Sequence, residues 1–184
     1  MISGTMKVAL DPTASQAAVI TKTLDCCGML WNRMIADEAK LRAELGQRFI
    51  PTPTKYKREL PQLNEADYEA LSGMRHRLLR QFQNHDYNPH DTPKPEPVAR
   101  MDSYFTRSKL AKGGFKIRFE DGGIRLPKLG LVPTELHAEL PAGAYIRSAI
   151  VEKSDGRFYC TVKYEHEQTA ETVAAAVAAE QRPA

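Results

Sequence analysis

The sequence divides at Asn88–Pro97, where four prolines fall within ten residues. Proline fixes its own φ and disfavours helix in the residue before it, so this stretch predicts an extended connector. Before the connector, apolar residues recur with the 3.6-residue period of helices, and after it they alternate as they do in strands. This change of period favours an α+β fold with a helical block and a separate β-rich part.

A short strand is predicted at Met6–Leu10, ahead of the helical block. Thr13 is a favourable N-cap, and Gln16 three residues later completes a capping-box pattern. The apolar spacing predicts a long helix from there to Leu45, closed by Gly46, with a break at Gly28 and with Trp31 on its buried stripe.

Two further helices are predicted after a loop at Ile50–Thr54. One is short and basic (Lys55–Leu60), and the other runs from an Asn64 cap to about Asn84. The predicted buried stripe of the last helix consists of Tyr68, Leu71, Met74, Leu78 and Phe82. Its opposite face carries Arg75, Arg77 and Arg80, and no acidic residue lies between Glu69 and Asp86. Such a face is either solvated or a rail for phosphates.

Five strands are predicted after the connector, with Gly- and Asp-Gly-rich turns between them. They are Ser103–Leu110, Gly114–Phe119, Thr134–Leu140, Ala144–Lys153 and Arg157–Tyr164. Short antiparallel strands with regular turns indicate a small barrel or curled sheet. If the first strand pairs with the later ones, the helices form an insertion into this sheet. The Ala-rich tail after Thr169 predicts a frayed helix or disorder.

Positive charge concentrates between Arg100 and Gly130, where 8 Lys and Arg stand against 3 Asp and Glu, whereas the whole chain carries only +3. Aromatic residues such as Tyr104, Phe105, Phe115 and Phe119 alternate with these cations. Aromatic rings offer faces for stacking bases, and Lys and Arg neutralise phosphates. The pattern favours nucleic-acid binding over a pair of ordinary solvated hairpins.

The cysteines indicate neither a disulfide nor a zinc site. Cys26 and Cys27 are adjacent, Cys160 is distant, and no Cys-x-x-Cys pair occurs. We expect all three to be small buried side chains. No leader-like or membrane-spanning apolar run is present. We therefore expect a reduced, cytoplasmic protein without cofactors or metal.

Several short motifs in one order resemble the N-terminal half of TnpB-type proteins, the transposon-encoded RNA-guided nucleases related to type V CRISPR effectors. The resemblance covers about Thr5 to about Glu165. Its motifs are Leu10-Asp11-Pro12-Thr13-x-x-Gln16, Cys27-x-x-Leu30-Trp31-Asn32, Thr52-Pro53-Thr54-Lys55-Tyr56, Leu60-Pro61, Asp102-Ser103-Tyr104, Ile124-Arg125-Leu126-Pro127-Lys128-Leu129-Gly130 and Asp155-Gly156-Arg157-Phe158-Tyr159.

The resemblance implies a wedge-type, OB-like antiparallel β-barrel with a helical recognition domain inserted after its first strand. It divides the chain into a first strand (1–10), the helical insertion (11–87), the connector (88–98), the rest of the barrel (99–167) and the tail (168–184). It also implies contacts with a guide RNA and with a short duplex motif, read near Pro53, Tyr68, Ser72 and Lys109. Members of the family often have Gln at the position of Ser72. Ser is shorter and cannot make the bidentate adenine contact that Gln can make.

The predicted nucleic-acid interface combines these motif-reading positions with the basic helix face and the basic strands. Its residues are Pro53, Thr54, Lys55, Tyr56, Lys57, Tyr68, Ser72, Arg75, Arg77, Arg80, Tyr104, Arg107, Lys109, Lys112, Lys116, Arg118, Arg125 and Lys128.

No catalytic set is predicted. The family's RuvC-like nuclease with its metal-binding carboxylates, and its zinc element, have no counterpart here, so we expect a module that binds structured RNA or duplex DNA without cutting it. Three alternatives stay open. The chain could dock as an interaction subunit on a separately encoded nuclease, act as a helix-turn-helix DNA-binding regulator built from Thr13–Leu45, or be an inactive remnant of a transposable element.

Overall fold

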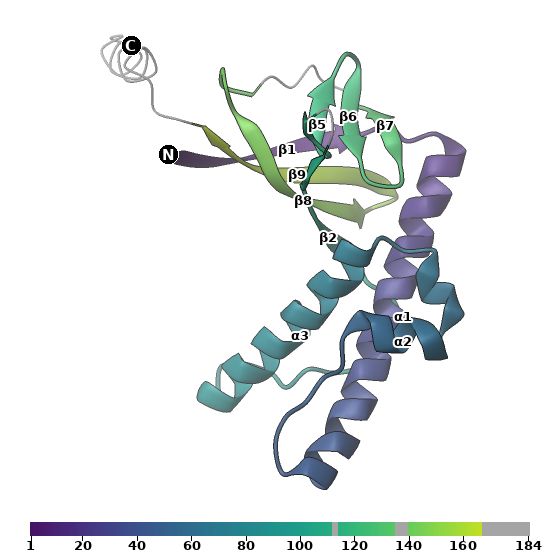
Figure 1. Cartoon of the computed structure of the whole chain (residues 1–184), viewed down its shortest axis with the longest axis vertical. Helices are drawn as coiled ribbons and strands as arrows, with labels where there is room; N and C mark the ends of the chain where they lie inside the picture. Colours follow the sequence, from purple (N-terminus) through teal and green to yellow (C-terminus); the bar gives the residue numbers. More distant parts are fainter. Residues whose placement is uncertain (112–113, 135–139, 167–184) are drawn as a thin grey trace.

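The computed structural model describes residues 1–111, 114–134 and 140–166. The elements are β1 (Ile2–Leu10), α1 (Ala14–Leu45), α2 (Pro53–Glu59), the 3-10 helix η1 (Pro61–Asn64), α3 (Tyr68–Tyr87), β2 (Ser103–Arg107), β3 (Leu110–Ala111), β4 (Gly114–Phe115), β5 (Arg118–Glu120), β6 (Gly123–Leu126), β7 (Gly130–Pro133), β8 (Tyr145–Ser154) and β9 (Arg157–His166). The sheets gather at one end of the molecule and the helices at the other (Figure 1). The predicted α+β class is confirmed.

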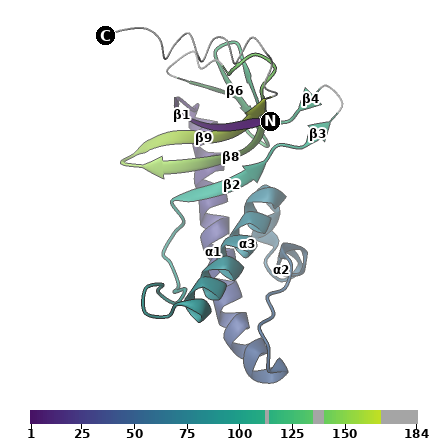
Figure 2. The same ribbon diagram turned by 90° about the vertical axis from the view of Figure 1, so that its left-hand side faces the viewer.

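The largest sheet joins the two ends of the described chain. Its strands follow the order β1-β9-β8-β2, and all neighbours are antiparallel. β1 pairs with β9 along its full length, from Ile2 opposite His166 to Leu10 opposite Phe158. The helices therefore lie between two paired strands, which confirms the predicted insertion. β2 borders the helical block in Figure 2.

The β-rich part is not a closed barrel in the described residues. β3-β4 and β5-β6-β7 form two smaller antiparallel sheets. The β5-β6-β7 sheet is joined to the large sheet by a β-bridge between Leu10 and Thr134. It is also joined by a 2.9 Å hydrogen bond from Asp11 N to Pro133 O. Because β3, β4 and β5 contain only two or three residues each, they are too short to extend the ladder from β2 and close the barrel.

Two strands were not predicted. β6 and β7 form a hairpin around Pro127–Leu129, within the Ile124–Gly130 motif. Most of the predicted strand Thr134–Leu140, and the tail from 167 onward, lie outside the described residues.

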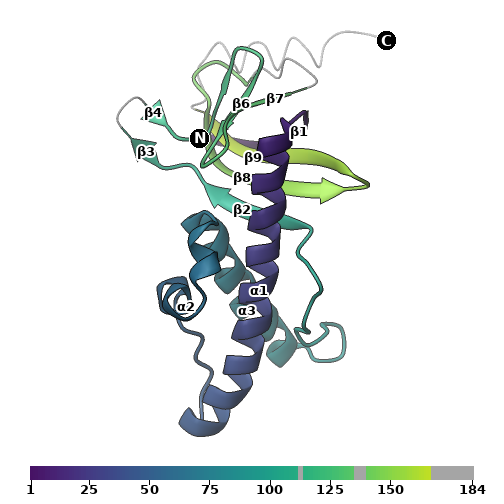
Figure 3. The same ribbon diagram turned by 90° about the vertical axis from the view of Figure 1, so that its right-hand side faces the viewer.

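The predicted start and end of α1 are confirmed. Thr13 Oγ1 accepts a bond from Gln16 N, Gln16 Oε1 accepts one from Thr13 N, and Gly46 ends the helix in a left-handed conformation. The break at Gly28 is wrong, because α1 is continuous from Ala14 to Leu45 (Figure 3). Gly28 is buried, and a Cβ there would lie 3.4 Å from Arg100 Cα, which is an ordinary contact distance.

α3 begins later than predicted. Asn64 belongs to η1, and Asp67 occupies the N-cap position of α3. Leu71, Met74, Leu78 and Phe82 are buried as expected, together with Ala70. Tyr68 is not part of the buried stripe, because it lies in the first turn and is 43% exposed.

The Pro-rich connector begins with a turn, in which Thr92 N donates to Asn88 O at 3.0 Å, so it is not extended throughout as predicted. Its second half is held against α1. Trp31 is buried in the core, as predicted, and its Nε1 donates to Glu96 O at 2.9 Å. Asn32 Nδ2 donates to Val98 O and its Oδ1 accepts from Val98 N, both at 2.8 Å. These bonds explain why Trp and Asn are adjacent in α1. No helix in the described part of the chain is long and apolar enough to cross a membrane.

Candidate nucleic-acid interface

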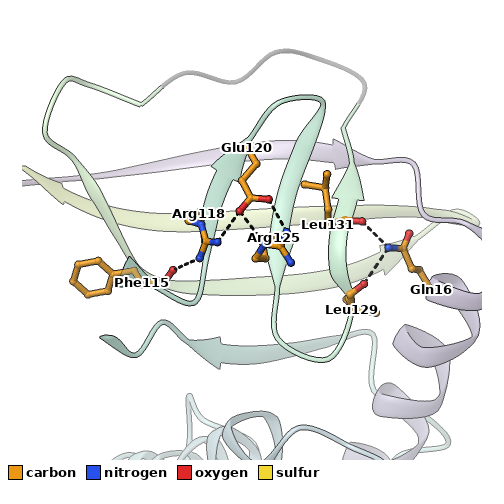
Figure 4. Close-up of polar contacts among 7 residues, drawn as sticks. All are labelled: Gln16, Phe115, Arg118, Glu120, Arg125, Leu129 and Leu131. Atoms are coloured by element: carbon orange, nitrogen blue, oxygen red, sulfur yellow. Dashed lines mark hydrogen bonds and ion pairs between the residues drawn. The ribbon is translucent and has the colours of Figure 1, made fainter. Parts of the chain in front are cut away.

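The basic residues of the small β5-β6-β7 sheet neutralise an acid within that sheet. Arg125 donates to both carboxylate oxygens of Glu120 at 2.9 and 2.8 Å, and Arg118 lies 2.8 Å from the same carboxylate (Figure 4). Hydrogen bonds from Arg125 and Arg118 lower the pKa of Glu120. Both arginines were predicted to contact nucleic acid, and in the structure both pair with this carboxylate.

The loop between β6 and β7 connects this sheet to the helices. Lys128 has a left-handed φ of 64°, and its Nζ donates to Asn64 O at 3.2 Å and Glu65 O at 3.3 Å. Gln16 donates from Nε2 to Leu129 O and Leu131 O at 3.1 and 2.7 Å (Figure 4). Lys128 was predicted to bind nucleic acid, and in the structure its ammonium group contacts these two backbone carbonyls.

The three arginines of α3 have different surroundings. Arg75 Nε donates to Ile50 O at 2.9 Å and to Pro51 O at 3.1 Å, so it fixes the loop before α2. Arg77 lies over the Trp31 ring at 5.8 Å from its centroid. Arg80 is exposed and makes no ion pair within the described residues. Of the three arginines of the predicted phosphate rail, Arg77 and Arg80 are exposed, whereas Arg75 is half-buried.

Two predicted aromatic contacts are in the core. Tyr56 is fully buried and Tyr104 is 5% exposed. Desolvation by burial raises the pKa of both phenols. Neither ring is exposed enough to stack on a base in this conformation. Pro53 is also buried, as the first residue of α2, while Thr54 and Lys55 beside it are exposed.

The first turn of α3 brings several predicted residues together. The Lys57 ammonium lies 5.7 Å from the centroid of the exposed Tyr68 ring. Lys109, beyond the end of β2, makes an ion pair with Glu69 at 2.5 Å. Ser72 follows Tyr68 by four residues, so both lie on one helix face. Three motif-reading positions thus meet on one surface, which we name the α3 start.

Thr106 Oγ1 donates to Asp67 at 2.9 Å and ties β2 to the α3 start. Beside this contact, the outer face of the large sheet holds a cleft of about 510 Å³. The cleft is lined by Phe105, Arg107, Ser108, Phe115, Arg147, Ser148, Lys163 and Glu165. Its volume lies within the usual range of ligand sites. The α3 start and this cleft together form one candidate interface.

The sequence prediction missed the residues that β8 and β9 contribute to this cleft, Arg147, Ser148, Lys163 and Glu165. Polar side chains at alternate positions of β8 and β9 could have indicated a polar sheet face. The sequence does not give the strand register, which decides which of these side chains share that face. Of the other predicted residues, Arg107 lines the cleft, Lys116 is exposed and Lys112 lies outside the described residues. Within the described ranges, no three His, Cys, Asp or Glu side chains are grouped closely enough to hold a metal ion.

The comparisons with known proteins concern the N-terminal quarter of the chain. No curated protein matches it. Residues 1–47 match the family model of a helix-turn-helix domain of the IS605 OrfB type. In the structure this segment consists of β1 and the uninterrupted helix α1. Over these residues the chain is similar to the N-terminal helix-turn-helix domain of the IS605 OrfB/TnpB family.

Proposed function

We propose that the chain is a transposon-associated DNA-binding module that also binds structured guide-type RNA, and that it acts without cutting either. The match of residues 1–47 to the IS605 OrfB helix-turn-helix domain supports the association with transposons and DNA. The surface chemistry of the α3 start and the adjoining cleft supports contact with a polyanion.

The observation that carries the proposal is the excess of positive charge on this continuous surface. Five cations (Lys57, Arg107, Lys109, Arg147 and Lys163) accompany three carboxylates (Asp67, Glu69 and Glu165). Lys109 and Arg147 make ion pairs with Glu69 and Glu165, whereas the other three cations make none within the described residues. An acid-poor surface beside an exposed Tyr ring suits phosphates with a neighbouring base or sugar.

The proposal includes recognition of a short duplex motif by the α3 start. Tyr68 and Ser72 project from the first turns of α3, and Lys109 is held beside them by Glu69. Side chains on the exposed face of a helix end can reach base edges in a groove, while the cations nearby fix the backbone. Ser72 would make a single hydrogen bond there.

Salt-dependent binding tests the proposal. We would measure the affinity for structured RNA and for duplex DNA between roughly 50 and 200 mM salt, where each phosphate contact to a duplex adds about 0.9 to the logarithmic slope. The double variant Lys57→Gln/Lys109→Gln should lower the slope by about 2. Lys94→Gln, an exposed cation on the connector, is the matched control and should leave the slope unchanged. Absence of binding near 50 mM salt, or a flat response, would refute the proposal.

The absence of cutting has its own test. The wild-type protein would be incubated with both nucleic acids and Mg²⁺ or Mn²⁺, and the products would be separated on a denaturing gel. We expect intact strands, and cleavage would contradict the non-catalytic part alone. A separately encoded nuclease that docks on this chain would appear as a co-purifying protein whose addition restores cleavage.

A helix-turn-helix regulator is the second candidate, because residues 1–47 match such a domain. The continuous helix Ala14–Leu45 disfavours it, since a recognition helix needs a turn that frees it to enter the major groove. A preference for palindromic duplexes over other duplexes of equal length would favour this candidate.

A further inference from the structure

A β-bulge builds the floor of the cleft on the outer face of the large sheet. The register between β8 and β9 shifts between Ile146 and Ser148, and both Ile146 and Ala149 point into the core. The two residues between them, Arg147 and Ser148, therefore lie on the outer face one after the other. Bulges of this kind redirect side chains and are frequent beside functional sites.

The charges in the cleft are separated along its length. Arg107 and Lys163 both lie opposite Ser148, one from β2 and one from β9, and neither makes an ion pair with any residue that the structure describes. Two strand spacings separate them, about 10 Å, which is within reach of successive phosphates or of one phosphate and its sugar. This end of the cleft attracts anions.

The other end carries the carboxylate of Glu165. Its Oε2 accepts a hydrogen bond from Tyr145 Oη at 2.9 Å, and its Oε1 lies 3.6 Å from Arg147 Nε. A negative charge at this end repels phosphate, and a carboxylate can accept hydrogen bonds from the N–H groups of a base or from a 2′-hydroxyl. An occupant with one anionic and one hydrogen-bond-donating end would fit in a single orientation.

An aromatic wall stands next to Glu165. The Phe115 and Tyr145 rings stack with centroids 4.7 Å apart and planes 10° apart. Phe115 lines this cleft, whereas Tyr145 lines a neighbouring cleft that Phe115 also borders, so Phe115 stands between the two. The stack fixes the Phe115 ring before any ligand arrives. A pre-formed ring is the usual platform for an unpaired base.

We propose that this cleft binds one unpaired nucleotide of a single-stranded segment, with the base against Phe115 and its phosphates at Arg107 and Lys163. This inference deepens the proposed function and rests on it. A base inside a duplex cannot reach the ring, because both its faces are already stacked. The cleft therefore adds affinity for single strands, whereas the α3 start contacts duplexes.

The test compares a 10-nucleotide RNA, the DNA of the same sequence and the corresponding duplex, by fluorescence anisotropy at about 50 mM salt, where phosphate contacts are strong. Phe115→Leu keeps the apolar contact but removes the ring, and should weaken single-strand binding roughly tenfold, as expected for one stacked base. The affinity for the duplex should stay within about twofold, because no base stacks there. Phe49→Leu, an exposed Phe in the loop between α1 and α2, is the matched control.

A second variant keeps the test valid if Phe115→Leu unfolds, which circular dichroism would reveal. Arg107→Gln/Lys163→Gln changes two exposed side chains and should lower the salt slope for single strands by about 1.4. Tighter binding of the RNA than of the DNA would identify a ribose contact, and equal binding would identify a contact to base and phosphate alone.

The inference is overturned if the Phe115→Leu and Phe49→Leu variants bind single strands equally well. It is also overturned if Phe115→Leu weakens duplex binding as strongly as it weakens single-strand binding. Its failure can be told apart from failure of the proposed function. A wild-type protein that binds duplex but not single strands retains the proposed function and loses the nucleotide cleft. A wild-type protein that binds neither loses both.

Discussion

Arg48 connects the far ends of α1 and α3 and offers a sharp test of the helical packing. Its Nε donates to Glu38 Oε1 at 2.8 Å, its guanidinium also binds Asp86, and it lies over the Phe82 ring at 4.4 Å. The Glu38 side chain is only 5% exposed and that of Arg48 15%. The remaining cation near Glu38 is Arg42, whose Nη1 lies 3.8 Å away on an exposed side chain.

Arg48→Met should destabilise the protein by about 3 kcal/mol, because breaking a buried ion pair leaves the other charge uncompensated. This value is at the low end of the usual range, since Arg42 can partly replace the lost charge. Met preserves the apolar contact with Phe82. For a chain of this size, the melting temperature should fall by about 6–12 °C. Glu38→Met combined with Arg48→Met should recover most of the loss, because no buried charge remains.

Urea unfolding followed by circular dichroism would measure these changes. Arg42→Met is the matched control, with an expected loss of about 0.5 kcal/mol for an exposed pair. The hydrogen bond from Arg48 lowers the pKa of Asp86, so this contribution is present above the pKa of an unfolded Asp and is lost as pH falls. The Arg48→Met variant should therefore lose less stability on acidification. Equal losses for Arg48→Met and Arg42→Met would refute this reasoning, as would a double variant no more stable than Arg48→Met.

Three further predictions concern other contacts. Asn32→Ala should cost about 2 kcal/mol and speed proteolysis within residues 88–98, since both Val98 backbone groups lose their partner; unchanged digestion would contradict this. Gly123→Ala should cost about 3 kcal/mol or more, because its Cβ would lie 2.2 Å from Val132 O, and a melting temperature within 1 °C or so of wild type would disprove the clash. Burial raises the pKa of Cys27 and of Cys160 to about 12, so iodoacetamide at about pH 8 should label neither thiol until the protein unfolds; labelling of folded protein would contradict this.

The sequence predicted local structure best where a local interaction decides it. Thr13 and Gln16 form the expected capping box, and Gly46 ends α1, because caps depend on residues a few positions apart. Gly28 misled the prediction, since the cost of glycine in a helix is small beside the packing of α1 against Arg100 and Met101.

The candidate interface could be predicted from the sequence only in part. Of the residues that the sequence predicted for it, Lys57, Tyr68, Ser72 and Lys109 lie at the α3 start and Arg107 lines the cleft. Composition could not tell which cations were already engaged. Arg125 and Lys128 satisfy groups within the fold, and only the positions of Glu120 and Asn64 reveal this.

The sequence by itself determined the helices, the connector and the order in which strand, helical block and strands follow one another. Hydrophobic period and capping residues specify these features over short distances along the chain. Only the tertiary structure decided the cleft, which needs the pairing of β2 with β8, the bulge at Arg147 and the placement of Lys163 on β9. Strand register and long-range pairing depend on the packing of the whole core, because a shift of one residue would turn each of these side chains to the opposite face.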